Sequence, residues 1–229
     1  MYAPRKGTGI SPSRRCGLFD WIMAARKRLM LEPSTLHMAF SIADRFCAVD
    51  RVDDTELRLF GAAALMIACK YEETVVHSVR TYVYICDMSY HKLELIDMER
   101  RILERLEYRL TVPTTYTFMA YAMRDTSGTP AQLKRARRYA ESALRDHRTL
   151  AHLPSEIAAA AIYLSRAQDV GHVQAQKTAL NGMCSVSHVA LARSVNHMIK
   201  VLAGAKVDRD SQCAPVTSDH FHPLLVAAC

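Results

Sequence analysis

The sequence contains few of the residues that interrupt regular secondary structure: of 229 residues, only eight are glycine and eight are proline. Alternation of Val, Ile or Thr with polar residues, which is typical of half-buried strands, is also rare. Ala, Leu, Met and Arg, which favour helices, are frequent instead. These features argue against a β protein and predict an all-α chain that is ordered over most of its length.

The sequence also lacks the short motifs that carry common catalytic chemistry. It contains no HExxH, no CxxC, no glycine-rich nucleotide motif and no GxSxG. The ten histidines are scattered, and the closest pair, His220 and His222, has no third metal ligand near it in sequence. We therefore expect no enzyme activity, no cofactor and no metal site, and we favour a binding or regulatory protein.

Signals for secretion, disulfide bonding or membrane insertion are missing as well. The cysteines number seven, an odd count, and form no CxxC pair, which suits reduced thiols in cytosol or nucleus. Met1 to Pro12 is too polar for a signal peptide. The uncharged run from Leu59 to Cys69 would span about 16 Å as a helix, roughly half of a bilayer core. We expect an intracellular protein, located in the nucleus or the cytoplasm, that has no membrane contact.

The net charge of +7 is concentrated in two places. Seven basic residues stand against one acid, Asp20, within the first 31 residues, and a second cluster lies further on. Between Asp50 and Arg109, acids outnumber bases by twelve to nine. The second cluster comprises Lys134, Arg135, Arg137, Arg138, Arg145 and Arg148. No long basic stripe that could track phosphates is evident, so nucleic acid is not the expected partner.

The run LFGAAALMIAC, Leu59 to Cys69, organises the first half of the chain. A helix that is apolar on all sides must be buried on all sides, and its small residues allow other helices to approach closely. Asp53 and Asp54 are expected to cap it. We expect helices on either side of it, which begin near Pro12, Pro33, Ser78 and Ser89.

Val112-Pro113 breaks the helical pattern, and the same plan then recurs. A helix is predicted from Ala131 to about Arg148, and a second alanine-rich run, Ile157 to Leu164, lies about 98 residues after the first. The predicted fold is two tandem five-helix units, each built around an alanine-rich central helix. The predicted division is a flexible arm at 1–11, units at 12–112 and 113–205, and a tail at 206–229.

The helix predicted from Ser89 to about Glu107 carries more apolar surface than a single core contact needs. Its core stripe is expected to consist of Leu95, Met98, Ile102 and Leu106. A second row, Ile96, Leu103 and Leu110, is interrupted by Glu99. Glu99 is either the partner of an internal ion pair or a hydrogen-bond acceptor for another protein. Lys70 follows the apolar run, so its stem can be buried while its ammonium group reaches the surface.

Five segments together resemble the cyclin box. They are Asp20-Trp21, Leu36 to Ala39, Ala43 to Phe46, the run that ends in Cys69-Lys70-Tyr71-Glu72-Glu73, and Met98-Glu99. In words, the family pattern is DW, then a TLHLA-like run, DRF, AAMLLASKFEE, and ME before a leucine-rich helix. The second half resembles the C-terminal cyclin box. The short flanks make the chain most similar to the viral cyclins of gammaherpesviruses.

The resemblance implies a regulatory subunit that binds and allosterically activates a host cyclin-dependent serine/threonine protein kinase and promotes cell-cycle progression. Protein substrates would be reached through the kinase. Lys70 and Glu99 match the residues that contact the kinase backbone near its mobile regulatory helix. The kinase-binding positions implied are Lys70, Glu99, Ile67, Tyr71, Glu72, Glu73, Leu103, Tyr108 and Leu110. Asp44 and Arg45 match internal links of the box.

The chain departs from the family at the patch that docks Arg-x-Leu motifs in many cell-cycle cyclins. Two apolar positions of that patch are occupied here by Arg14 and Gly17, whereas Leu18 and Trp21 are retained. The polar Gln often found nearby is Arg58. Fewer apolar anchors and two added cations predict weak docking of a positively charged motif, and hence reduced sensitivity to inhibitors that use it.

Two other interpretations of the sequence remain open. A cyclin-fold transcription factor would bind promoter DNA in place of a kinase, which the paired boxes and the net positive charge allow. A kinase-independent helical adaptor would keep the fold but would need neither Lys70 nor Glu99. The cluster from Lys134 to Arg148 is either a surface for nuclear import or phosphate binding, or a solvated helix face.

Overall fold

The computed structural model describes residues 9–183 and 185–205, and over these ranges the protein is all-α, as predicted. The predicted tail, with His220 and His222, and most of the predicted arm lie outside the described residues. The chain divides into two compact units, Met1–Val112 and Pro113–Cys229. Among the described residues, no helix combines the length and the apolar character that crossing a membrane requires.

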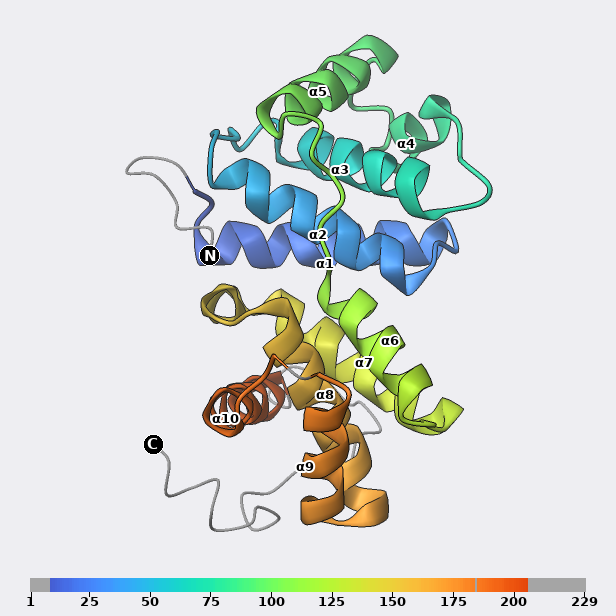
Figure 1. Cartoon of the computed structure of the whole chain (residues 1–229). Helices are drawn as coiled ribbons and strands as arrows, with labels where there is room; N and C mark the ends of the chain where they lie inside the picture. Colours follow the sequence, from blue (N-terminus) through green and yellow to red (C-terminus); the bar gives the residue numbers. More distant parts are fainter. Residues whose placement is uncertain (1–8, 184, 206–229) are drawn as a thin grey trace. The chain divides into compact units, whose positions relative to one another are not determined.

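The first unit contains five helices, which Figure 1 shows with α3 between the α1–α2 pair and α5. Their bounds are α1 Pro12–Arg28, α2 Pro33–Cys47, α3 Leu57–Glu72, α4 Val79–Ile85 and α5 Lys92–Arg105. Every residue of α3 from Leu59 to Cys69 is buried, because α1, α2, α4 and α5 all pack against this helix. The prediction of a buried central helix is confirmed.

The helix starts follow local chemistry at two points and depart from prediction at a third. Ser11 caps α1, since its hydroxyl accepts from the Arg14 amide, and Pro12 occupies the first turn. His91 and Glu94 form a capping box that starts α5 at Lys92, three residues later than predicted. The expected cap of α3 is wrong: α3 begins at Leu57, after a turn whose carbonyls at Asp53 and Asp54 accept hydrogen bonds.

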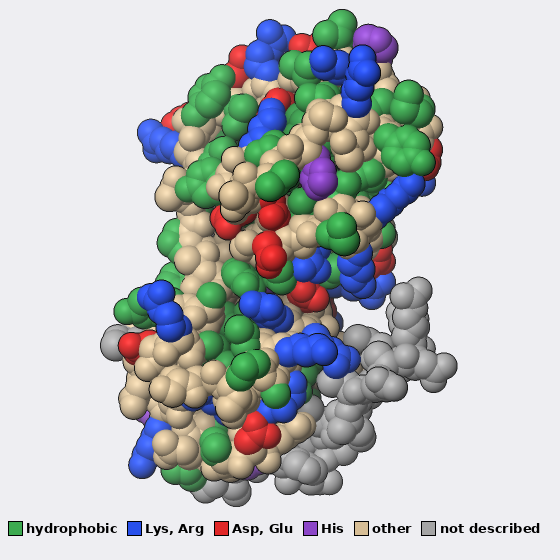
Figure 2. All heavy atoms as spheres, turned by 90° about the vertical axis from the view of Figure 1, so that its right-hand side faces the viewer, with side chains coloured by type: hydrophobic (Ala, Val, Ile, Leu, Met, Phe, Trp, Pro, Cys, Tyr) green, Lys and Arg blue, Asp and Glu red, His purple; other side chains and the backbone are tan. Residues whose placement is uncertain are grey.

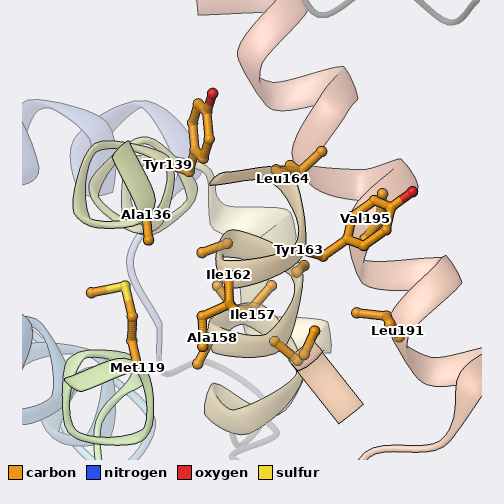
Figure 3. Packing of buried hydrophobic residues seen from close by; sticks show 14 of the residues in the cluster. Met119, Ala136, Tyr139, Ile157, Ala158, Ile162, Tyr163, Leu164, Leu191 and Val195 are labelled. Atoms are coloured by element: carbon orange, nitrogen blue, oxygen red, sulfur yellow. The ribbon is translucent and has the colours of Figure 1, made fainter. Parts of the chain in front are cut away.

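The second unit repeats the plan around α8. Its helices are α6 Thr115–Asp125, α7 Pro130–Arg145, α8 Pro154–Val170, α9 His172–Asn181 and α10 His188–Ala205, with a 3₁₀ turn η1 at His147–Ala151. Figure 3 shows α8 side chains meeting Met119 of α6, Ala136 of α7 and Leu191 of α10. The helix predicted to run to Arg148 ends at Arg145, because Asp146 accepts from the Arg148 amide and caps η1 instead.

Candidate functional site

The polar end of α3 is joined to α5 by one ion pair. The Lys70 Nζ lies 2.6 Å from the Glu99 Oε1. The side chain of Lys70 is 43% exposed and that of Glu99 is 14% exposed, so the pair sits at the surface with the carboxylate partly covered. The pair is therefore internal to the first unit and accessible to another molecule at the same time.

Exposed aromatic side chains accompany this ion pair. Tyr71 is 46% exposed at the end of α3, and Tyr108 is 65% exposed in the turn after α5. Leu103 and Leu110 are half-buried, and Glu72 is exposed. We call the surface formed by Lys70, Glu99, Tyr71, Leu103, Tyr108 and Leu110 the α3–α5 rim. Apolar surface around a small number of charged groups is typical of protein-binding sites.

Two residues that the resemblance placed in the binding surface have internal positions. Ile67 is 3% exposed and belongs to the core, because α3 packs against its neighbours along its whole apolar run. Glu73 accepts hydrogen bonds from the Glu32 amide, at 2.7 Å, and from the Thr35 hydroxyl. Since Glu32 provides no side-chain cap for α2, the Glu73 carboxylate caps that helix and joins the end of α3 to the start of α2.

The Asp44-Arg45 pair has the internal role that the sequence predicted. Arg15 donates two hydrogen bonds to Asp44, at 2.7 and 2.8 Å, and Arg45 donates to the Arg109 carbonyl. The sequence did not predict that Arg15 binds Asp44, because the two residues lie 29 positions apart. The guanidinium of Arg15 also lies over the Phe40 ring, 5.4 Å from its centroid. These contacts join α1, α2 and the segment after α5.

The residues of the degenerate docking patch lie on α1 and α3, but they do not form an apolar surface. Gly17 is exposed and has open space around it, whereas Leu18 is buried against Gly61 of α3. Trp21 is half-buried against the same glycine, and Arg58 is exposed. Arg14 turns away to Asp54, at 2.6 Å, and to the Val52 carbonyl.

Much of the second basic cluster is occupied by contacts within its own unit. Arg135 pairs with Asp169 and donates to the Ser165 carbonyl. Arg137 donates to the Tyr116 hydroxyl, and Arg148 pairs with Asp146. Lys134 and Arg138 are exposed. In Figure 2, the Lys and Arg side chains of the described residues are interspersed with acidic and hydrophobic ones.

The described residues offer little for catalysis. Over residues 9–183 and 185–205, no group of three or more His, Cys, Asp and Glu side chains could hold a metal ion. The four cysteines described there are free thiols. Burial raises the pKa of Cys47 to about 12 and that of Cys86 to about 11, so neither is a reactive thiolate at neutral pH.

The described residues thus form two successive five-helix units, the first of which carries a charged and apolar rim. Residues 1–111 match the family description "Cyclin, N-terminal domain", and residues 113–220 match "Cyclin, C-terminal domain". The chain belongs to the cyclin family.

Relatives by sequence are plant cyclins. The chain is 38% identical over 159 residues to Cyclin-B1-3 of Oryza sativa subsp. japonica. This match covers 69% of this chain and 34% of that protein. It is 34% identical over 170 residues to Cyclin-A1-2 of Arabidopsis thaliana, covering 72% of this chain and 38% of that protein. The chain thus spans about a third of the length of the curated relatives that it matches.

Solved structures share the fold at low identity. A viral cyclin from herpesvirus saimiri matches with a TM-score of 0.76 at 20% identity, over 86% of this chain and 88% of that one. A chain of the yeast RNA Pol II CTD kinase CTDK-1 complex matches with a TM-score of 0.75 at 15% identity, over 98% of this chain and 79% of that one.

Proposed function

We propose that this cyclin is the regulatory subunit of a cyclin-dependent serine/threonine kinase and that the α3–α5 rim binds the kinase. The observation that carries the proposal is the ion pair of Lys70 and Glu99 among exposed tyrosines at the end of a buried helix. Family membership supports it, since the resemblance to the cyclin box matches these two residues to positions of kinase contact. The cyclin contributes no catalytic group to phosphoryl transfer.

The rim can bind the end of a partner helix by completing its backbone hydrogen bonds. The ammonium of Lys70 can donate to orphan carbonyls, and the carboxylate of Glu99 can accept from orphan amides. Tyr71 and Tyr108 then cover the apolar face of that helix. Activation follows if the rim fits the active kinase conformation better than the inactive one, because a ligand shifts an equilibrium only by its differential affinity.

The test is a pair of substitutions in the rim with a charge-matched control. Lys70→Glu and Glu99→Ala should each weaken binding to a purified cyclin-dependent kinase by about tenfold or more and lower its phosphotransfer activity. Arg100→Glu is the control. It reverses an exposed charge on α5, the helix that carries Glu99, and breaks an ion pair with Asp97, but it should change kinase affinity little. Circular dichroism checks that helix content is kept. Full activation by the Lys70→Glu, Glu99→Ala double variant would refute the site.

We propose further that docking of Arg-x-Leu motifs is weak. The open space at Gly17 and the exposed Arg58 support this, because the first removes an apolar anchor and the second repels a cationic motif. In fluorescence polarisation, a peptide that carries the motif should bind weakly, with a Kd higher than micromolar. An inhibitor segment that relies on this motif should therefore inhibit the complex poorly. Nanomolar binding of the peptide would contradict this proposal.

The proposal has four further parts: the cyclin is of viral origin, its partner is a host kinase, it promotes cell-cycle progression, and it is located in the nucleus. The support for viral origin is the resemblance of the sequence motifs, because the solved viral cyclin, at 20% identity, shows the fold alone. The identities of 38% and 34% are with plant cyclins. DNA binding is disfavoured because Arg135, Arg137 and Arg148 are occupied by contacts within their own unit.

A further inference from the structure

One hydrogen bond links two elements of the α3–α5 rim. The Tyr71 hydroxyl, at the end of α3, lies 2.7 Å from the Thr111 hydroxyl, in the segment that follows α5. Both residues are exposed. The cyclin-box pattern given above has Phe at the position of Tyr71, and a Phe side chain has no hydroxyl for this bond.

The segment from Glu107 to Thr111 follows α5, and contacts with the surrounding structure must hold its backbone in place. Glu107 and Tyr108 have φ angles of 51° and 56°, in the left-handed region that side-chain-bearing residues rarely adopt. The Tyr108 amide donates to the Leu103 carbonyl, and the Leu110 amide donates to the Tyr108 carbonyl. Such conformations persist only where several contacts determine them.

Two side chains from other helices anchor this segment. Arg45 of α2, which is buried, donates to the Arg109 carbonyl. Tyr71 of α3 binds Thr111, two residues further on. Tyr108 and Leu110, the two apolar residues of the rim in this segment, therefore lie between or next to anchored positions.

We propose that Thr111 is a positioning residue for kinase binding, which acts by fixing the Tyr71 ring and the Tyr108–Leu110 segment in the arrangement that the partner helix meets. This inference rests on the proposed function of the rim. The Tyr71–Thr111 bond is exposed to water, so it adds little to the stability of the fold. It restricts the side chain and the backbone that form the binding surface, and this reduces the ordering cost of association.

The experiment is a double-mutant cycle on kinase affinity with Tyr71→Phe and Thr111→Val, which each remove one hydroxyl and keep the shape. Each variant should bind about threefold to tenfold more weakly, and the double variant no more weakly than either single one. Thr111→Ser keeps the hydroxyl and should restore affinity. Tyr90→Phe is the matched control. Tyr90 is another tyrosine of the first unit, it lies outside the rim, and its hydroxyl donates to the Thr55 carbonyl.

Thermal unfolding separates positioning from a structural role. The midpoints of Tyr71→Phe and Thr111→Val should stay within about 1–2 °C of the parent while their affinities fall. Unchanged affinity in both variants, or losses that add fully in the double variant, would overturn the inference. If Lys70→Glu abolishes binding in the same assay, the proposed function survives that outcome. If Lys70→Glu also has no effect, the rim itself is not the kinase site.

Discussion

At the scale of single residues, exposure distinguishes ion pairs that hold the fold from the pair at the rim. The side chain of Arg15 is 3% exposed, and it donates two hydrogen bonds to Asp44. Removal of Asp44 would take both of these hydrogen bonds from the buried Arg15 guanidinium, which makes this pair sensitive to mutation. Lys70 and Glu99 share one contact, and the side chain of Lys70 is 43% exposed. Their pair can therefore exchange its contact for a partner's backbone at low cost.

Glu72 and Glu73 show how adjacent residues of one motif can have different roles. Glu72 is exposed, whereas the carboxylate of Glu73 caps α2 through Glu32 and Thr35. A substitution of Glu73 would remove a helix cap, and its effect on kinase binding would be mixed with an effect on folding. Lys70 and Glu99 are therefore the better positions at which to test the rim.

At the scale of helices, the closeness of α1 to α3 depends on Gly61. A Cβ atom added there would lie 2.7 Å from Leu18 Cδ1 and 3.2 Å from the Trp21 ring. Gly61→Ala should thus lower the free energy of unfolding by about 1–3 kcal/mol, although alanine is the better helix former.

Gly17 provides the matched control on the facing helix. A Cβ at Gly17 would meet no heavy atom within 4 Å, so Gly17→Ala should raise the free energy of unfolding by about 0.5–1 kcal/mol. Urea denaturation measures both variants. Equal shifts in the same direction would show that helix propensity, and not packing between α1 and α3, dominates at Gly61.

The same scale shows what the sequence could predict. The run from Leu59 to Cys69 has no charge, so its burial followed from composition alone. The stripe of Leu95, Met98, Ile102 and Leu106 is buried, as its spacing predicted. These features depend on the periodicity of one helix, which is written in consecutive residues.

The features that the sequence did not predict are of two kinds: contacts between residues far apart in the chain, and a residue that caps a new turn where a helix was expected to continue. The bond of Tyr71 to Thr111 joins residues 40 apart, and the Glu73 cap reaches back to Glu32. The end of α7 was misplaced because Asp146 starts a new turn. The motif resemblance located Lys70 and Glu99, but no spacing rule could have shown that they bind each other.

At the scale of the whole molecule, each unit has its own core, and each core environment keeps histidine neutral. Burial, followed by the nearby Arg26, lowers the pKa of His37 in the first unit to about 3. In the second unit, His152 and His197 stack with centroids 4.7 Å apart. Burial lowers the pKa of both, with further lowering from Arg193 at His152 and from His152 at His197.

The sign of the resulting pH dependence follows from proton binding. Unfolded histidines take up protons as the pH falls through about 6.5, whereas the folded ones, whose pKa values are lowered, take up protons only at lower pH. Their contribution to stability is therefore complete above about pH 6.5 and is lost as the pH falls. For His37, the loss approaches about 1.4 kcal/mol per pH unit between about pH 6.5 and its folded pKa of about 3.

Acid should consequently destabilise both units, and one substitution should protect only the first. Trp21 is the single tryptophan, so its fluorescence reports the first unit, while circular dichroism follows both. As the pH is lowered from 7.5 to 5, the urea concentration at the unfolding midpoint should fall, whether it is measured by fluorescence or by circular dichroism. His37→Met, which removes the buried imidazole, should flatten the pH dependence of the Trp21 transition, whereas His188→Gln, at an exposed position of α10, should not. An unchanged pH slope in His37→Met would mean that His37 is not the group whose protonation unfolds the first unit.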